Sequence, residues 1–169
     1  MTFSPQLRKL VLTAHITSTL GWLGAVVVFL AMAIVGMAGQ DAQTVRGVYL
    51  VMEPTSWLVL VPLAFASLLT GIMQALGTTW GLFRHYWVLF KLLMTVFVTI
   101  VLLIYVETFN VMAGVAADPS ADLVSVRNVS PILHAVLALL VLFTATVLAV
   151  YKPRGMTRYG WRKQYAKRA

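Results

Sequence analysis

Four long stretches of nearly uninterrupted apolar side chains dominate the chain, at about residues 10–36, 57–76, 86–107 and 131–151. At 1.5 Å per residue in an α-helix, each stretch is long enough to cross a hydrocarbon layer of roughly 30 Å. Polar residues, glycine and proline gather between the stretches. The pattern predicts an all-α fold, a four-helix transmembrane bundle that forms one membrane domain over residues 1–169 and ends in a basic tail, 152–169.

The charged residues support this interpretation and give it a direction. Only 11% of the residues are charged and 60% are hydrophobic, a composition too apolar for an ordinary soluble domain. The net charge is +8, and every Lys and Arg except Arg46 and Arg127 lies on the side of the two termini, opposite all five acidic residues. This positive-inside bias predicts an up-down-up-down topology with both termini cytoplasmic. It also explains the positive charge without a nucleic-acid partner.

Two of the spans carry further local signals. The first follows two basic residues, but its length of about 26 residues exceeds the apolar core of a signal peptide, roughly 7–15 residues, so we expect a retained helix. In the second, Pro62 lacks an N–H donor, which predicts a kink. Ser67, Gly71 and Ala75 form a narrow face on the same helix, on which a neighbouring helix would pack closely.

Ionisable side chains at membrane depth are costly, about 2.5 to 3.5 kcal/mol at the centre, so each one is a candidate functional group. An inner layer, near the predicted cytoplasmic surface, contains His15, Ser18, Thr19, Gln74 and Lys91. We interpret His15 either as a histidine hydrogen-bonded to a neighbouring helix or as an axial ligand or proton-handling group. Lys91 either extends to the lipid headgroups or points inward toward His15 and Gln74, where it would form part of a cofactor-binding site.

An outer layer lies toward the opposite surface and contains Glu53, Tyr105, Glu107, Arg127, Asn128 and His134. Glu53, Glu107 and His134 together offer the oxygen and nitrogen ligands of a divalent metal site. Alternatively, Glu53 pairs with Arg46 and Glu107 pairs with Arg127, and these ion pairs only fasten the loops.

The tail, KPRGMTRYGWRKQYAKRA, alternates cations with Tyr159, Trp161 and Tyr165. Such a segment can lie on an anionic leaflet, with its aromatic rings at headgroup level and its cations near lipid phosphate. We therefore expect the lipid bilayer and anionic lipid headgroups as partners. The alternative is a tail that only sets the orientation of the protein.

Three segments of the chain carry a family resemblance. They are HITSTLGWLGAVVVFLAMAI in the first span, PLAFASLLTGIMQALGTTWGLFRHYWVLFKLLMTVFVTIVLL across the second and third, and the return helix that closes on YKPRG. They resemble a widespread bacterial family of four-span integral membrane proteins that has no assigned function. The resemblance implies a bacterial cytoplasmic membrane but no chemistry. Members often carry a histidine where this chain has Tyr105, a difference that would weaken an outer metal or haem site at His134.

A second resemblance rests on scattered residues. They are a histidine seven residues before Trp-x-Gly, a later lysine, an Arg-Asn-Pro stretch and a closing Lys-Pro. They are His15, Trp22, Gly24, Lys91, Arg127, Asn128, Pro131, Lys152 and Pro153. The pattern is distantly similar to that of the haem-binding membrane protoporphyrinogen oxidase and of copper-resistance membrane proteins. The similarity implies a b-type haem on His15, with Lys91 as a proton-handling or second-ligand group. His134 cannot be the partner of His15, because the two enter their spans from opposite sides.

No catalytic motif accompanies these groups. The sequence has no glycine-rich phosphate loop, no nucleophile elbow and no cysteine, which excludes thiolate metal sites and haem attached through cysteine. We expect a membrane protein with a structural or accessory role, as a homo-oligomer or as part of a larger membrane complex. Two alternatives stay open: a haem b protein that uses His15, and a small transporter subunit with a polar pathway near Gln74 and Lys91.

Overall fold

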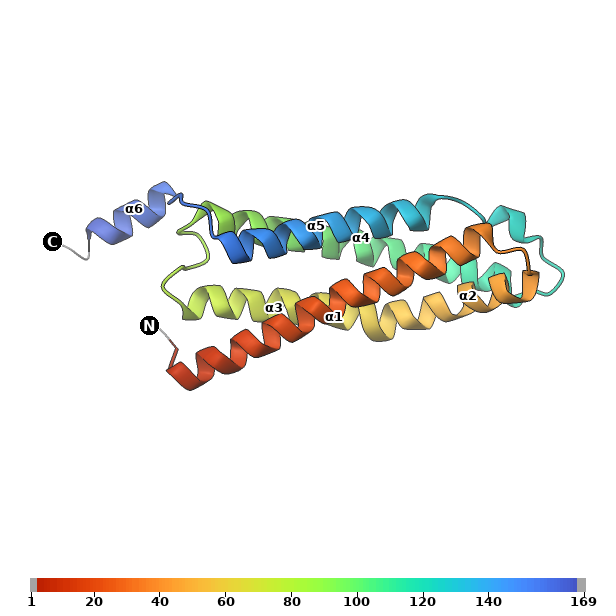
Figure 1. The fold of residues 1–169 in the computed structure, drawn as a ribbon, viewed down its shortest axis with the longest axis horizontal. Coiled ribbons are helices and arrows are strands. Elements are labelled where there is room, and N and C mark those ends of the chain that lie inside the picture. Colours follow the sequence, from red (N-terminus) through yellow and green to blue (C-terminus); the bar gives the residue numbers. More distant parts are fainter. Residues whose placement is uncertain (1–2, 167–169) are drawn as a thin grey trace.

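The computed structural model describes residues 3–166, and these residues form helices joined by short connections (Figure 1). In chain order the elements are α1 (Pro5–Ala38), α2 (Ala42–Thr55), the π-helical turn η1 (Ser56–Leu60), α3 (Val61–Gly77), α4 (Tyr86–Ala117), the 3₁₀ turn η2 (Leu123–Ser125), α5 (Ser130–Tyr151) and α6 (Arg158–Tyr165). The predicted all-α four-helix bundle is confirmed.

Four helical segments are long and apolar enough to cross a membrane, and they are Pro5–Ala38, Ala42–Gly77, Tyr86–Ala117 and Leu123–Tyr151. Large apolar side chains cover their outer surfaces, among them Leu10, Leu58, Phe97, Ile104 and Phe143. Because an aqueous surface would not favour so much exposed hydrocarbon, this surface suits a lipid bilayer. The chain is a multi-pass membrane protein.

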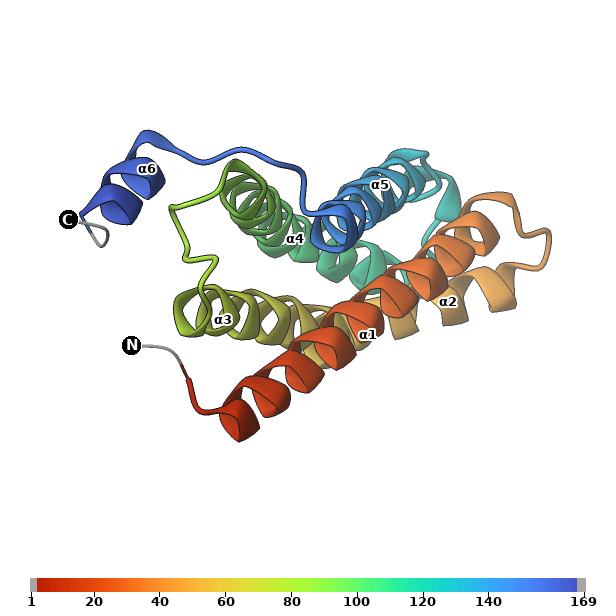
Figure 2. The ribbon, with the colours of Figure 1, turned by 60° about the vertical axis from the view of Figure 1, so that its left-hand side comes forward.

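The two ends of the bundle differ in charge, and we name them accordingly. The basic end comprises the start of α1, the connection 78–85 and the end of α5, and the acidic end comprises the α1–α2 and α4–α5 connections (Figure 1). Figure 2 shows α1 crossing α3 at an angle, with α4 and α5 side by side above them in the view. α1 contacts α3 and α5, while α4 contacts α2, α3 and α5.

Helix α4 extends ten residues beyond the predicted span, from 108 to 117. The predicted end of this span at about residue 107 was therefore wrong. Phe109, Met112 and Ala116 are buried at helical spacing, and they pack against the core. This buried stripe continues the helix past the polar residues Glu107 and Asn110, which lie on its exposed side.

The second span is a single rod built from α2, η1 and α3. The irregularity that we predicted near Pro62 takes the form of a π-helical turn, in which the N–H of Val61 donates to the carbonyl of Ser56. A proline four residues after Leu58 cannot donate to its carbonyl, so the wider turn lies where the regular α-helical bond is missing.

The small-residue face of α3 packs on α1, as the sequence predicted. The Thr19 and Ser67 hydroxyls are 2.8 Å apart, and Gly71 lies directly under the ring of His15. Close approach of the two backbones brings the polar groups of α1 and α3 into contact at membrane depth.

At the basic end, the chain after α5 pairs with the connection between α3 and α4. Helix α5 ends at Lys152 in the left-handed conformation, with φ of 45°, and Pro153 follows, which confirms the predicted helix end. Thr157 then donates its N–H to the carbonyl of Arg84 and its hydroxyl to the carbonyl of Phe83. The pairing fixes the start of α6, which projects beyond the bundle (Figure 1).

Candidate functional site

A cavity of about 600 Å³ opens at the basic end between α1, α3, α4 and α5. Its volume falls within the range of small-molecule sites. The ionisable and amide groups that line it are Arg8, His15, Gln74, Lys91 and Lys152. The structure thus brings His15, Gln74 and Lys91 of the predicted inner layer into one cavity, from three different helices.

The hydrogen bonds of His15 define which ring nitrogen carries the proton. Its Nδ1 lies 3.2 Å from Oγ1 of Thr70, and the Thr70 hydroxyl donates to the carbonyl of Ala66 at 2.5 Å. Since the single hydroxyl proton of Thr70 is used in that bond, its oxygen accepts from Nδ1–H of His15. In the neutral ring, Nε2 then keeps its lone pair, and it has no hydrogen-bond partner among residues 3–166.

The ring of His15 also lies close over Gly71. A methyl group on Gly71 would lie 3.1 Å from Cε1 of the imidazole, tighter than ordinary van der Waals contact. A hydrogen bond on one nitrogen and a glycine beneath the ring fix its orientation while they leave Nε2 unused. This is the arrangement of histidines that bind a metal through one nitrogen and are oriented through the other.

Ser18 and Thr19 have structural contacts. The Ser18 hydroxyl donates to the carbonyl of His15 at 3.1 Å, and Ser18 is buried away from the cavity. Thr19 lines the cavity, but its hydroxyl is engaged with Ser67. Thr19 therefore joins α1 to α3, Ser18 bonds within α1, and His15 is the group of this helix turn with an unused acceptor.

The electrostatics of the cavity are one-sided. Lys91, Arg8 and Lys152 line it, and no Asp or Glu is among its lining residues. The Lys152 ammonium lies 5.6 Å from the centre of the Trp80 ring. Trp87 also lines the cavity, and its buried indole N–H has no acceptor in the part of the chain that the structure describes. The cavity therefore offers positive charge and hydrogen-bond donors to an anionic group.

His85, the remaining histidine of the basic end, does not contribute to this cavity. Its Nδ1 lies 2.8 Å from the carbonyl of Trp80, in the connection before α4. His85 therefore does not provide a second imidazole ligand, and Lys91, which lines the same cavity as His15, is a candidate from another helix.

The structure does not bring the predicted outer metal ligands together. Residues 3–166 contain no group of three His, Asp or Glu side chains that could hold a metal ion. Glu107 is exposed and accepts from the Asn110 amide, whereas Tyr105, two residues earlier, stacks on His134. Two residues correspond to about 200° of rotation around an α-helix, so Glu107 and Tyr105 face opposite ways. The prediction of a metal site formed by Glu53, Glu107 and His134 was therefore wrong.

Arg46 forms a contact that sequence reasoning missed. It does not pair with Glu53, because its guanidinium donates to backbone carbonyls at the end of α4 and in the following connection. They belong to Val115, Ala116, Asp118, Pro119 and Ala121. The preference of cations for helix carboxyl ends was the signal that could have suggested it.

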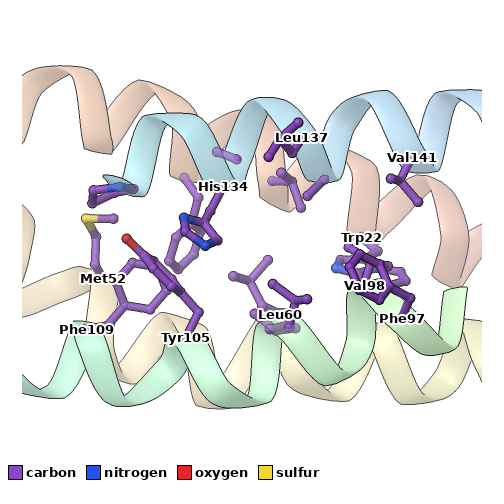
Figure 3. Close-up of a pocket in the computed structure, with 17 residues that line it drawn as sticks. Trp22, Met52, Leu60, Phe97, Val98, Tyr105, Phe109, His134, Leu137 and Val141 are labelled. Atoms are coloured by element: carbon purple, nitrogen blue, oxygen red, sulfur yellow. The ribbon is translucent and has the colours of Figure 1, made fainter. Parts of the chain in front are cut away.

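A second cavity, of about 270 Å³, lies closer to the acidic end between α1, α4 and α5 (Figure 3). Its walls are almost wholly apolar, and His134 and Tyr105 supply its polar edge. No pattern in the sequence predicted this cavity, because it arises where side chains of several helices do not fill the space between them.

Together the two cavities place one oriented histidine in each half of the bundle. The one at the basic end combines an unused imidazole nitrogen with cations, and the other surrounds an imidazole with apolar side chains. Comparison with protein-family models, with curated proteins and with solved structures gives no match to this chain.

Proposed function

We propose that the protein binds an anionic lipophilic cofactor, a b-type haem, in the cavity at the basic end. The observation that carries the proposal is the state of His15, whose Nδ1–H is held by Thr70 while Nε2 stays unpaired in a cavity lined by cations. Haem needs one or two axial ligands for iron and positive or donor groups for its propionates.

The residues of this cavity fit such a group. His15 would supply a nitrogen ligand to the iron, and Lys91 would hold either the iron or a propionate. The buried N–H of Trp87 would gain an acceptor. Bound haem would supply one-electron redox chemistry, and the residues of this chain would set its depth, its orientation and its access to water.

An absorption spectrum of the detergent-purified protein, produced with ample haem, tests the proposal. We expect a Soret band that His15→Ala abolishes and that the matched control His134→Ala retains, since His134 lines the other cavity. Lys91→Met should shift or weaken the band. A colourless preparation with normal folding, or a band that survives His15→Ala, would contradict the proposal and favour a structural or accessory role.

We further infer that the basic end faces the cytoplasm of a bacterial cell. The positive-inside bias supports this orientation, because among the Lys and Arg residues of 3–166 only Arg46 and Arg127 lie at the acidic end. Reporter fusions at both termini should both show a cytoplasmic location. A periplasmic signal from either terminus would contradict the orientation.

We infer that α6 lies on anionic lipid. Tyr159, Trp161 and Tyr165 are exposed on this short helix, beside cationic side chains, and the Trp161 and Tyr165 rings stack with centres 6.0 Å apart. In nanodiscs, trypsin should cleave this helix more slowly with anionic lipid than with zwitterionic lipid, and high salt should remove the difference. Equal cleavage in both lipids would contradict the inference.

A further inference from the structure

We propose that the cavity around His134 is a second ligand site, which takes a planar lipophilic molecule of the phenol or quinol class and accepts its hydroxyl proton in a hydrogen bond to Nε2. This cavity and its histidine are different from those of the proposed haem site. Binding here therefore stands or falls independently of that site.

The tautomer of His134 is fixed by its neighbours. Nδ1 lies 2.9 Å from the carbonyl oxygen of Ser130, and a carbonyl can only accept, so Nδ1 carries the proton. Nε2 of the neutral ring is therefore an acceptor, and no donor reaches it among residues 3–166. An acceptor left without a donor in an apolar cavity is unfavourable, and a ligand hydroxyl would remove that cost.

The ring is also held in place before any ligand arrives. Tyr105 stacks on it with centres 4.0 Å apart and planes tilted by only 23°. The Tyr105 hydroxyl donates to Oγ of Ser130 at 2.9 Å, so the same serine positions both rings. Figure 3 shows the two rings together at one edge of the cavity. Such orientation reduces the entropic cost of binding.

The cavity walls indicate the kind of molecule that fits. Trp22, Phe29, Phe97 and Phe109 line it, and no charged side chain does. Aromatic walls favour a flat aromatic ligand, and the absence of a counter-charge disfavours an ion at this depth. A lipid acyl chain would fill the space, but it would leave Nε2 without a donor.

The route into the cavity leads from the bilayer. Phe97 and Leu137 line the cavity and are also 64% and 50% exposed on the apolar surface of α4 and α5. The opening therefore lies between two membrane-spanning helices, where a lipid-soluble molecule is concentrated. A water-soluble substrate would have to cross headgroups and hydrocarbon to reach it.

Thymol, a lipophilic phenol, and its methyl ether form a matched pair of probes, because the ether lacks only the hydroxyl donor. Calorimetry in nanodiscs should show saturable thymol binding that His134→Phe weakens about tenfold, and much weaker binding of the ether. His15→Phe, in the other cavity, should leave thymol binding unchanged. Equal binding of thymol and its ether, or equal binding to wild type and His134→Phe, would overturn the proposal.

Nitrogen NMR of histidine-labelled protein gives a second measurement that needs no variant at the site. The chain has three histidines, so the signals can be assigned with His15→Phe and a substitution of His85. Thymol should shift Nε2 of His134 alone, and a shift at His15 instead would overturn the proposal. If His134→Phe does not fold, Ala138→Leu narrows the cavity and should abolish the shift while it leaves the histidine in place.

Discussion

Arg46 is predicted to hold the acidic end together, and its removal tests the packing of the α4–α5 connection. Its guanidinium donates to five carbonyl oxygens, and the shortest bonds are 2.6 Å to Asp118 and 2.7 Å to Ala121. Val115 and Ala116 lie in the last turn of α4, and the other three carbonyls lie in the connection after it, where the regular helical hydrogen bonds end. Arg46→Met would remove both the donors and the positive charge at this helix end.

The magnitude follows from the two short bonds. Bonds from a charged donor are worth roughly 1.5–3 kcal/mol each, which we reduce to about 1 kcal/mol because Arg46 is partly exposed. The helix dipole adds about 0.5 kcal/mol, which gives a loss of roughly 2–3 kcal/mol. For a chain of 169 residues this corresponds to a fall in apparent Tm of roughly 4–12 °C. The apparent Tm of Arg46→Lys should lie between those of wild type and Arg46→Met, because an ammonium cannot reach all five carbonyls.

Differential scanning fluorimetry in detergent would measure the shift, and limited proteolysis of the connection 118–129 would localise it. Arg127→Met is the matched control, because the Arg127 side chain lies at the same end but forms no hydrogen bond or ion pair with residues 3–166. If Arg46→Met has the same apparent Tm as the Arg127→Met control, and its 118–129 connection is cleaved no faster, the carbonyl contacts do not stabilise the fold.

Three further results are expected. Gly71→Ala should displace the ring of His15, so that haem titration shows severalfold weaker binding while the apparent Tm is unchanged or higher; unchanged binding would argue against an oriented ligand. Gly36→Ala would put a methyl group 2.8 Å from the buried ring of Tyr49 and should cost roughly 1–3 kcal/mol of unfolding free energy, whereas an unchanged Tm would refute the tight packing. Hydrogen bonds from the first turn of α2 lower the pKa of Asp41 below its ordinary 3.8, so its contribution to stability is present above that pH and is lost as the pH falls further. The Tm difference between wild type and Asp41→Asn should accordingly change only on the acid side, and a constant difference from about pH 6 to about pH 3 would contradict it.

The spans were predictable because each consists of a long apolar run, and a bilayer leaves helices as the natural solution. The end of α4 was not predictable in this way, because the sequence becomes more polar at Glu107. The helix continues beyond that residue through a buried stripe of Phe109, Met112 and Ala116. That stripe is visible as a periodicity, but its burial depends on α2, which packs beside it. Tertiary contact decided the boundary.

The depth of a residue along its span predicted which polar side chains meet at the basic end, but it did not do so at the acidic end. His15 and Lys91 share a cavity because their helices happen to turn both residues inward. Glu107 lies near the depth of His134, but it is rotated away from it. Sequence position gives depth directly, whereas rotation depends on which face each helix packs, and the apolar character of all faces in a membrane hides that choice.

The π-helical turn Ser56–Leu60 changes the direction in which side chains point around the axis of one long helical rod. On its acidic side the rod directs Tyr49 and Met52 into the core, and on its basic side it presents Thr70 and Gly71 to His15. One surplus residue in such a turn corresponds to about 100° of azimuth. Deleting a residue there would leave both halves helical and equally hydrophobic but would aim Thr70 at lipid. The orientation of His15 on α1 therefore depends on a turn that ends about ten residues before Thr70 in the neighbouring rod.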